Sequence, residues 1–411
     1  MLDILIKQAN IFGEVEQLDI GICHAKVSLK ESDIKVNAKE IIDGKDKLVI
    51  PGFVDSHTHL EKALLDDHVS NHSGTLQEAI ENFKVYFKTV DEENFYERAK
   101  KALEKAIVGG TTTLRSHISV SKELKFKAIA PLLELKKDMA DYITLEVVAF
   151  ATPFPDVLDK ENLSRLEKAL EKGATVLGGC PTLAPNHKEF IDTFFELAIA
   201  NNCPLDFHVD ESDEPNIQAL EYLAEKTIKE GYEGKVTAGH CCSLSAVDDD
   251  TAMRVILKVK EAGITIVTLP SANLYLMGRN DCQPIRRGIT RVRELLDNQV
   301  NVAYSSDNLR DPFRPFGNFD MLEEALLMAQ VAQMGREIDF ENILKMGTYN
   351  AAKGMGLVDY GLEVGNTANL VLLDASSAKD AIISQANKSH IIKNGKIVAK
   401  NRKTSHLIYN N

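Results

Sequence analysis

The sequence predicts an α/β fold: a (β/α)8 TIM-like barrel with a small β-sandwich domain formed by both termini. In residues 51–360, short β-like runs alternate with helical stretches, a pattern that fits a barrel better than a doubly wound sheet. Residues 1–50 and 361–411 contain successive strand-like runs instead. We therefore expect the two ends to pair into one β domain. A chain of 411 residues is long enough for one large and one smaller domain.

The terminal segments are predicted to be β-rich because their apolar residues come in short, strand-like runs. Near the C-terminus, Asn394 and Gly395 form a strong signal for a two-residue hairpin turn. Strand-like runs occur at Ile4–Ile6, Asp19–Cys23, Ala25–Leu29, Asp33–Val36, Ala368–Asp374 and Ile391–Val398.

The middle of the chain begins with a predicted buried strand, because the run from Leu48 to Val54 is apolar and partly β-branched. Helical stretches follow, and each leads into a β-like run. One helix is expected to end at Gly173. Other helices are expected at Asn94–Val108, Phe190–Ala200, Asp249–Ala262 and Thr290–Asp297. One strand is expected to begin at Leu205. Other strands are expected at Thr111–Ser116, Tyr142–Phe150, Ala174–Gly178, Ile264–Leu269 and Val300–Tyr304.

His57 and His59 lie two residues apart at the end of the first of these strands. If the strand continues through them, both side chains point to the same side. Two imidazoles on one rigid strand can hold a metal ion, and a catalytic metal site needs such ligands plus an open position for water. An isolated pair of this kind is more often two satisfied polar residues, so the prediction depends on the rest of the chain.

Further residues of the required types follow strand-like stretches. His208 and His240 each end a short β-like run, Glu211 comes three residues after His208, and Asp307 closes the series. In a (β/α)8 barrel the C-terminal ends of all strands meet at one face, where the chemistry is found. The chain has 11 histidines, and four of them fall at these strand ends. The sequence therefore predicts a metal site at the mouth of the barrel.

The composition excludes some classes of partner. The net charge is −13, whereas nucleic acids and anionic membranes favour basic surfaces. The sequence has no run of about 18 uncharged apolar residues, and charges interrupt the N-terminus where a signal peptide needs an apolar core. The six cysteines lack metal-type spacing and fit thiols in a reducing compartment. We expect a cytoplasmic protein that binds neither nucleic acid nor membrane.

Several motifs together resemble one enzyme superfamily. The stretch from Pro51 to Leu60, followed by His208, His240 and Asp307 in that order, resembles the metal-dependent amidohydrolases. Three more stretches look like the bacterial cytosine deaminase group and its relatives, the triazine N-alkylamide hydrolases: Asn273–Arg279, Pro284–Arg293 and Asp307–Asn318. The resemblance covers essentially the whole chain.

The resemblance implies one divalent metal ion, with His57, His59, His208 and Asp307 as ligands. Three imidazoles and a carboxylate suit zinc, iron or manganese. The ion would lower the pKa of its bound water toward about 7. A small-molecule substrate and a homo-oligomeric assembly are the partners that the resemblance implies.

The catalytic residues implied by the resemblance are Asp307, His240 and Glu211. Asp307 would accept a proton from the water and orient the nucleophile, and His240 would polarise the hydroxide or the developing oxyanion. Glu211 would carry a proton to a ring nitrogen and then to the departing amine. It occupies the position of the proton shuttle in the deaminases of this group, whereas the triazine N-alkylamide hydrolases lack a glutamate there.

Four residues are expected to contact the substrate: Lys62, His117, Thr152 and Asn308. For Lys62 a place on the rim is the alternative, and for His117 a structural hydrogen bond. Cytosine deaminases have a glutamine near Thr152, which reads the pyrimidine edge, and an aspartate at the position of Asn308. A single hydroxyl cannot replace the two groups of an amide, so these differences argue against cytosine as the substrate.

The sequence therefore predicts a metal-dependent hydrolase that deaminates an amino-substituted N-heterocycle and releases ammonia. The ring could be a cytosine-like pyrimidine, a pterin or a triazine. Hydrolysis of an N-alkylamine or a cyclic amide is the alternative within the superfamily. A non-catalytic binding protein is a third hypothesis, against which the complete ligand set and Glu211 argue.

Overall fold

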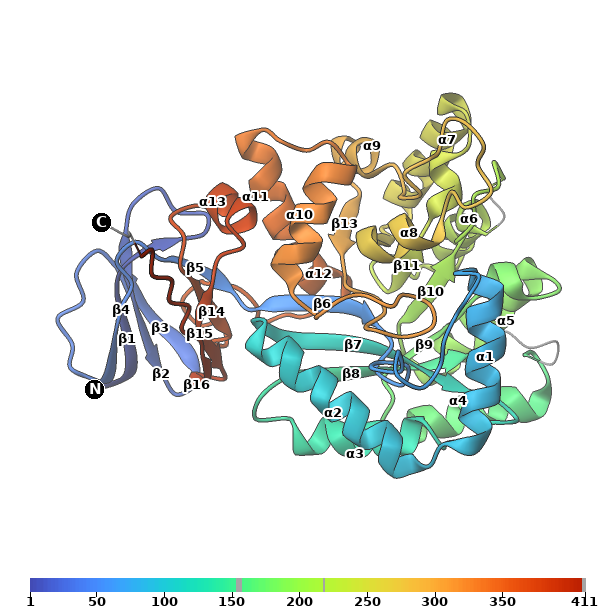
Figure 1. The fold of residues 1–411 in the computed structure, drawn as a ribbon, viewed down its shortest axis with the longest axis horizontal. Coiled ribbons are helices and arrows are strands. Elements are labelled where there is room, and N and C mark those ends of the chain that lie inside the picture. Colours follow the sequence, from blue (N-terminus) through green and yellow to red (C-terminus); the bar gives the residue numbers. More distant parts are fainter. Residues whose placement is uncertain (153–156, 217–218, 409–411) are drawn as a thin grey trace.

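The computed structural model describes residues 1–152, 157–216 and 219–408. The predicted barrel is present, and a sheet built from both ends of the chain lies beside it (Figure 1). The fold class expected from the sequence is thereby confirmed. Because the ligand candidates follow barrel strands, the barrel is the part of the fold that positions the site.

Eight parallel strands form the barrel in chain order from β6 to β13. The backbone N–H of Asp307 donates to the carbonyl of His57 over 3.0 Å, and Ser56 N–H donates to Ser305 Oγ over 2.9 Å. These bonds join the end of the last strand to the first, and they bring Asp307 beside the histidine pair. The strands are β6 (Phe53–Thr58), β7 (Thr111–Val120), β8 (Thr144–Ala151), β9 (Val176–Gly179), β10 (Leu205–Val209), β11 (Val236–His240), β12 (Thr265–Thr268) and β13 (Asn301–Tyr304).

Helices surround the strands, so most strand residues are buried on both faces of the sheet. The ends of the helices are set by local capping: Asp91, for example, accepts a hydrogen bond from the backbone N–H of Asn94 at the start of α2. The expected helices are present, with ends shifted by a few residues. The helices are α1 (Leu76–Thr89), α2 (Glu92–Val108), α3 (Ile129–Asp138), α4 (Lys160–Lys172), α5 (His187–Asn201), α6 (Leu220–Glu230), α7 (Asp249–Glu261), α8 (Pro270–Leu276), α9 (Val292–Asp297), α10 (Met321–Val331), α11 (Glu337–Met346), α12 (Tyr349–Gly354) and α13 (Ala378–Ile383). Two short 3-10 turns, η1 (Pro181–Leu183) and η2 (Cys242–Ser245), follow β9 and β11.

The second sheet joins both ends of the chain in the order β16-β15-β14-β5-β1-β2-β3, with β4 added beside β1. Asn394 and Gly395 both have positive φ, 50° and 70°, as a tight hairpin turn between β15 and β16 requires. The strand expected at Asp33–Val36 is wrong, because β4 forms later and runs parallel to β1. The strands are β1 (Leu2–Ile11), β2 (Leu18–Cys23), β3 (Lys26–Glu31), β4 (Ala38–Asp43), β5 (Leu48–Pro51), β14 (Leu370–Leu373), β15 (Lys388–Lys393) and β16 (Lys396–Lys400).

The apolar run from Leu48 to Val54 is divided at Gly52 instead of forming one strand. Its first half, β5, pairs with β14 in the terminal sheet, and its second half, β6, opens the barrel. A Cβ at Gly52 would overlap Cγ2 and Oγ1 of Thr112. Only glycine therefore allows the chain to pass this close to β7 at the point where it leaves one sheet for the other.

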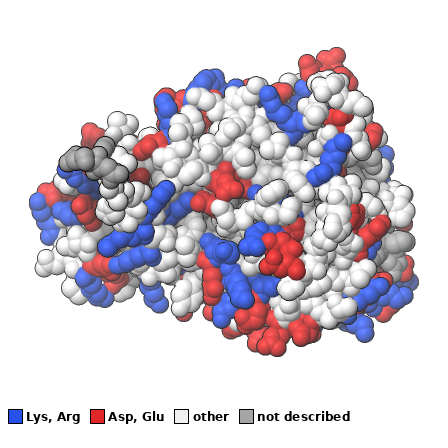
Figure 2. All heavy atoms as spheres, viewed as in Figure 1, with Lys and Arg blue, Asp and Glu red and all other residues white. Residues whose placement is uncertain are grey.

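The surface carries charges of both signs. Acidic and basic side chains are interspersed over the face drawn in Figure 2. Among the described residues, no helix is long and apolar enough to span a membrane.

We predict that Gly52→Ala lowers the free energy of unfolding by about 1–3 kcal/mol, the usual cost of overpacking. Thr112→Ala removes the two atoms that overlap most, although Thr112 Cβ would still lie 2.8 Å from the new methyl group. Urea unfolding of both single variants and the double variant measures this. The double variant should lose less free energy of unfolding than the two single variants lose together. If the two losses simply add, the predicted overlap between Gly52 and Thr112 is wrong.

Candidate metal centre and catalytic pocket

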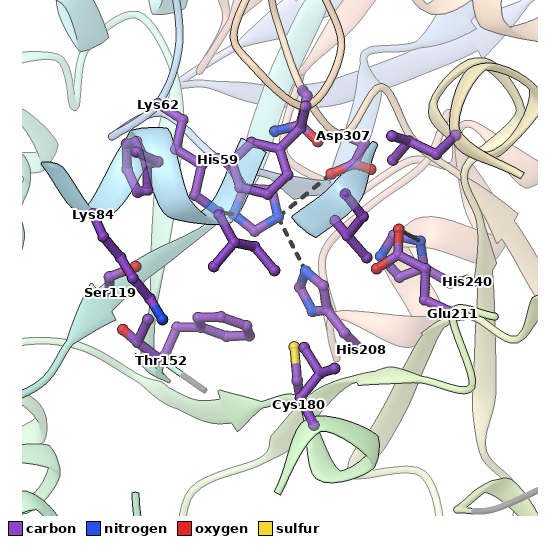
Figure 3. A pocket seen from close by; sticks show the side chains of 18 residues that line it. His59, Lys62, Lys84, Ser119, Thr152, Cys180, His208, Glu211, His240 and Asp307 are labelled. Atoms are coloured by element: carbon purple, nitrogen blue, oxygen red, sulfur yellow. Dashed lines mark hydrogen bonds and ion pairs between the residues drawn. The ribbon is translucent and has the colours of Figure 1, made fainter. Parts of the chain in front are cut away.

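The four predicted ligand residues converge at the mouth of the barrel. His57 belongs to β6, His59 follows it directly, and His208 lies on β10. His59 Nε2 lies 3.0 Å from His208 Nε2 and 3.4 Å from Asp307 Oδ1, and His57 Nε2 is 3.8 Å from the same oxygen. Figure 3 shows His59, His208 and Asp307 directed toward one another. The ring nitrogens of His57, His59 and His208 that converge here lie within 4.8 Å of one another, close enough to share one ion.

The backbone at two of the strand ends is left-handed. His240, the last residue of β11, has φ 69°, and Asp307, beyond β13, has φ 59°. Such conformations cost non-glycine residues about 1–3 kcal/mol each and persist only where the surrounding structure enforces them. At Asp307 the hydrogen bond to the His57 carbonyl supplies part of this constraint. Both residues line the pocket at the mouth of the barrel.

The donor set fits a divalent metal ion. Among the described residues, both ring nitrogens of His57, Nδ1 of His208 and Oδ1 of Asp307 are buried and have no hydrogen-bond partner. An unpaired buried polar group costs about 1–3 kcal/mol, and a cation at the point of convergence would pair His57 Nε2 and Asp307 Oδ1 at once. Burial lowers the pKa of His57, His59 and His208 well below its usual range, which keeps these imidazoles neutral. Neutral imidazole is the form that binds metals.

Glu211 and His240 lie side by side next to the ligand cluster (Figure 3). Glu211 Oε1 is 3.3 Å from His240 Nδ1. Burial raises the pKa of Glu211 to about 7 and lowers that of His240 to about 3. Near neutral pH, His240 is therefore uncharged, and Glu211 can both give and take a proton.

A pocket opens onto the cluster of candidate ligands. Lys62, Thr152 and Asn308, all expected at the substrate, line it together with Glu211 and His240. Much of the remaining wall is apolar: Leu76, Ile80 and Phe83 on α1, with Phe150, Leu276 and Phe313. The ammonium group of Lys62 lies 4.5 Å from the centre of the Phe313 ring. A small organic ring fits a pocket with these walls and few polar groups.

His117 lies deeper in the barrel and is not among the residues that line the cavity. Its ring centre is 4.1 Å from that of His57, and its Nε2 is 3.1 Å from Asp206 Oδ1. Asp206 also accepts a hydrogen bond from Arg115 over 2.8 Å. This position favours the alternative in which His117 has a structural role and packs against His57, instead of contacting the substrate.

Sequence reasoning missed several residues of the site. Asp206 lies two residues before His208 and faces the same side of β10, a signal that could have indicated it. Asp311 accepts a hydrogen bond from Asn308 Nδ2 over 2.6 Å, so the amide nitrogen of Asn308 faces this carboxylate. Asn273 on α8 contacts His240, and nothing in its local sequence announced that contact.

Comparison with known proteins agrees with this architecture. The profile of the amidohydrolase family matches residues 48–398. An N-isopropylammelide isopropyl amidohydrolase of Pseudomonas sp. is 32% identical over 406 residues, covering 97% of each chain. A pterin deaminase of Rhizobium rhizogenes is 29% identical over 362 residues, covering 87% of this chain and 82% of its own. The crystal structure of a 5-methylcytosine deaminase from Klebsiella pneumoniae superposes with a TM-score of 0.92 at 29% identity, covering 98% of this chain and 99% of its own.

We predict that His57→Ala or Asp307→Ala loses bound metal, or lowers activity by several orders of magnitude, with the fold retained. Each change removes one of the four donors that converge on the same point. Metal content by mass spectrometry and circular dichroism on the purified variants measure both effects. His406→Ala, a change at an exposed histidine, is the control and should keep wild-type metal content. A ligand variant with near-normal metal and turnover would contradict the assignment.

Proposed function

The chain belongs to the amidohydrolase family, and from this premise and the geometry of the site we propose that it is a metal-dependent hydrolytic deaminase. Its substrate is an amino-substituted N-heterocycle of the pyrimidine, pterin or triazine type, and its products are the oxo-substituted ring and ammonia. As a member of this family it is a hydrolase acting on carbon–nitrogen bonds other than peptide bonds. Relatives that deaminate pterin and 5-methylcytosine support the proposed substrate class.

His57, His59, His208 and Asp307 are the proposed ligands of one divalent ion, for which zinc, iron and manganese all suit the donor set. When bound, such an ion acts as a Lewis acid and lowers the pKa of a water ligand toward about 7. Asp307 accepts the proton that the attacking water gives up and orients that water toward the ring. His240 Nε2, which is buried and has no partner among the described residues, is placed to face the oxygen on which negative charge develops.

The position and the raised pKa of Glu211 are the observations that favour deamination over hydrolysis of an N-alkylamine. Its carboxyl group has a pKa raised to about 7 and lines the cavity beside the ligand cluster. Attack on an aromatic C–NH₂ carbon is easier once the adjacent ring nitrogen holds a proton, and Glu211 can supply that proton. Glu211 can then take up the proton that Asp307 received from the water and pass it to the leaving amine, and the proton of the new hydroxyl group restores Glu211 as the oxo ring forms. The substrate lies against the apolar wall, with Lys62, Thr152 and Asn308 around its polar edge.

A second candidate function is hydrolysis of an N-alkylamine. The 32% identity to an N-isopropylammelide isopropyl amidohydrolase favours it, and the apolar side chains of α1 could accommodate an alkyl group. The two functions differ in the product released. Assays for ammonia and for alkylamine over a panel of pyrimidines, pterins and triazines separate them.

We predict that Glu211→Gln retains metal and loses roughly 10²- to 10⁴-fold in kcat, because glutamine keeps the shape but cannot transfer a proton. The sign of the pH effect follows from the donor role. Protonated Glu211 is the active form, so wild-type kcat/KM falls as the pH rises through about 7, and this limb disappears in the variant. Glu214→Gln, three residues away and exposed, is the control. A wild-type rate in Glu211→Gln would refute the shuttle.

We predict that cytosine is a poor substrate and that Thr152→Gln improves its turnover relative to other aminated rings. An unpaired polar ring edge costs about 1–3 kcal/mol, or roughly ten- to a hundred-fold in kcat/KM. Thr152→Val keeps the size, removes the hydroxyl and should bring no gain. Steady-state kinetics on cytosine test this: a wild-type kcat/KM equal to that of efficient deaminases would show that Thr152 is no barrier.

A further inference from the structure

Asn273 makes a buried hydrogen bond to the ring of His240. Its amide nitrogen Nδ2 lies 3.0 Å from His240 Nδ1, and both residues are almost completely buried. Asn273 belongs to α8, where its backbone N–H donates to the carbonyl of Leu269 over 2.9 Å. The amide is therefore held by a helix that lies outside the strands bearing the ligands.

The orientation of this amide determines which ring nitrogen carries the proton. An amide nitrogen only donates, so a neutral His240 that accepts at Nδ1 must hold its proton at Nε2. Turning the amide over would move its two N–H groups away from His240 Nδ1, to the buried position where Oδ1 now has no partner. The orientation found leaves only Oδ1 of Asn273 without a partner there. Buried N–H groups without partners are rarer than under-satisfied carbonyl oxygens, which supports the orientation found.

We propose that Asn273 is a positioning residue that holds His240 in the Nε2–H tautomer, so that a hydrogen-bond donor, and not a base, faces the reacting oxygen. His240 Nε2 is buried and has no partner among the described residues, and the ring lines the cavity. A donor aimed at the place where charge develops stabilises the transition state. The role assigned to His240 rests on the proposed function, whereas the tautomer itself is a property of the protein without substrate.

Glu211 lies near the same nitrogen of His240 and, when ionised, favours the opposite tautomer. Its Oε1 lies 3.3 Å from His240 Nδ1, farther than the amide nitrogen of Asn273. An ionised Glu211 would favour a proton on Nδ1, whereas a protonated Glu211 is compatible with the tautomer that Asn273 selects. Asn273 thus keeps Glu211 and His240 from forming an ion pair, and leaves the carboxyl group available for the ring nitrogen of the substrate.

The test is the tautomer of His240 in the zinc-loaded protein, read by long-range ¹H–¹⁵N NMR correlation on histidine-labelled samples. The His240 signals are assigned by their loss in His240→Gln. We expect Nε2 to be protonated and Nδ1 to be unprotonated near neutral pH in the wild type. A proton on Nδ1 in the wild type would overturn the proposal, and this measurement requires no variant of Asn273 to fold.

Asn273→Asp should favour the other tautomer of His240, because a carboxylate accepts a hydrogen bond and draws the proton to Nδ1. We expect Nδ1–H in this variant, unchanged zinc content, a similar KM and a kcat lowered roughly 10²- to 10⁴-fold, the range seen when a catalytic histidine is held in the wrong tautomer or loses its proton-transfer role. Asn162→Asp is the matched control, because Asn162 is also buried and its Nδ2 donates to the carbonyl of Val157 on the barrel exterior. It should leave both the His240 tautomer and kcat unchanged.

The outcomes separate this proposal from the proposed function. An Asn273→Asp protein whose His240 keeps the wild-type tautomer would refute the positioning role. A protein that has the expected tautomer but deaminates none of the aminated rings would refute the proposed substrate class and leave the inference on Asn273 standing.

Discussion

The candidate site depends on one constraint: His57, His59, His208 and Asp307 share a buried space in which several of their polar atoms have no partner among the described residues. Neutral imidazoles and a carboxylate cannot all pair among themselves, and burial without partners is costly. A cation at their convergence resolves the conflict. The four side chains are attached at or just beyond the ends of strands whose hydrogen bonding closes the barrel, so the position of the candidate ligands follows from the backbone.

Buried polar networks hold the strand ends around this centre. Asp55 on the first strand accepts hydrogen bonds from the backbone N–H and hydroxyl of Ser306, next to Asp307. The guanidinium group of Arg314 donates to the backbone carbonyl of Asn308 over 3.0 Å and fixes the same loop from the other side. Below the ligands, Arg115 and Asp206 hold His117 against His57. Buried hydrogen bonds and ion pairs of this kind hold side chains in place, as a metal centre of defined geometry requires.

The different roles proposed for Glu211 and His240 follow from their surroundings. Burial disfavours the charged form of each, so the same physical effect raises the pKa of the acid and lowers that of the base. The result is a carboxyl group that exchanges a proton near neutral pH beside an imidazole that stays uncharged. Different environments for neighbouring titratable groups commonly separate their roles in catalysis.

The sequence by itself determined the architecture and the ligand candidates, because strand periodicity, the His57–His59 spacing and the placement of His208, His240 and Asp307 at strand ends are local signals. It did not separate His117, which lies below the ligands, from Lys62, Thr152 and Asn308, which line the cavity. It also missed the break at Gly52 and the partners Asp206, Asp311 and Asn273. The break and the role of Asn273 depend on contacts between residues distant in the chain: Gly52 meets Thr112 on another strand, and Asn273 on α8 meets His240 on β11. Only tertiary packing brings such groups together, since no periodicity along one segment encodes a partner on another.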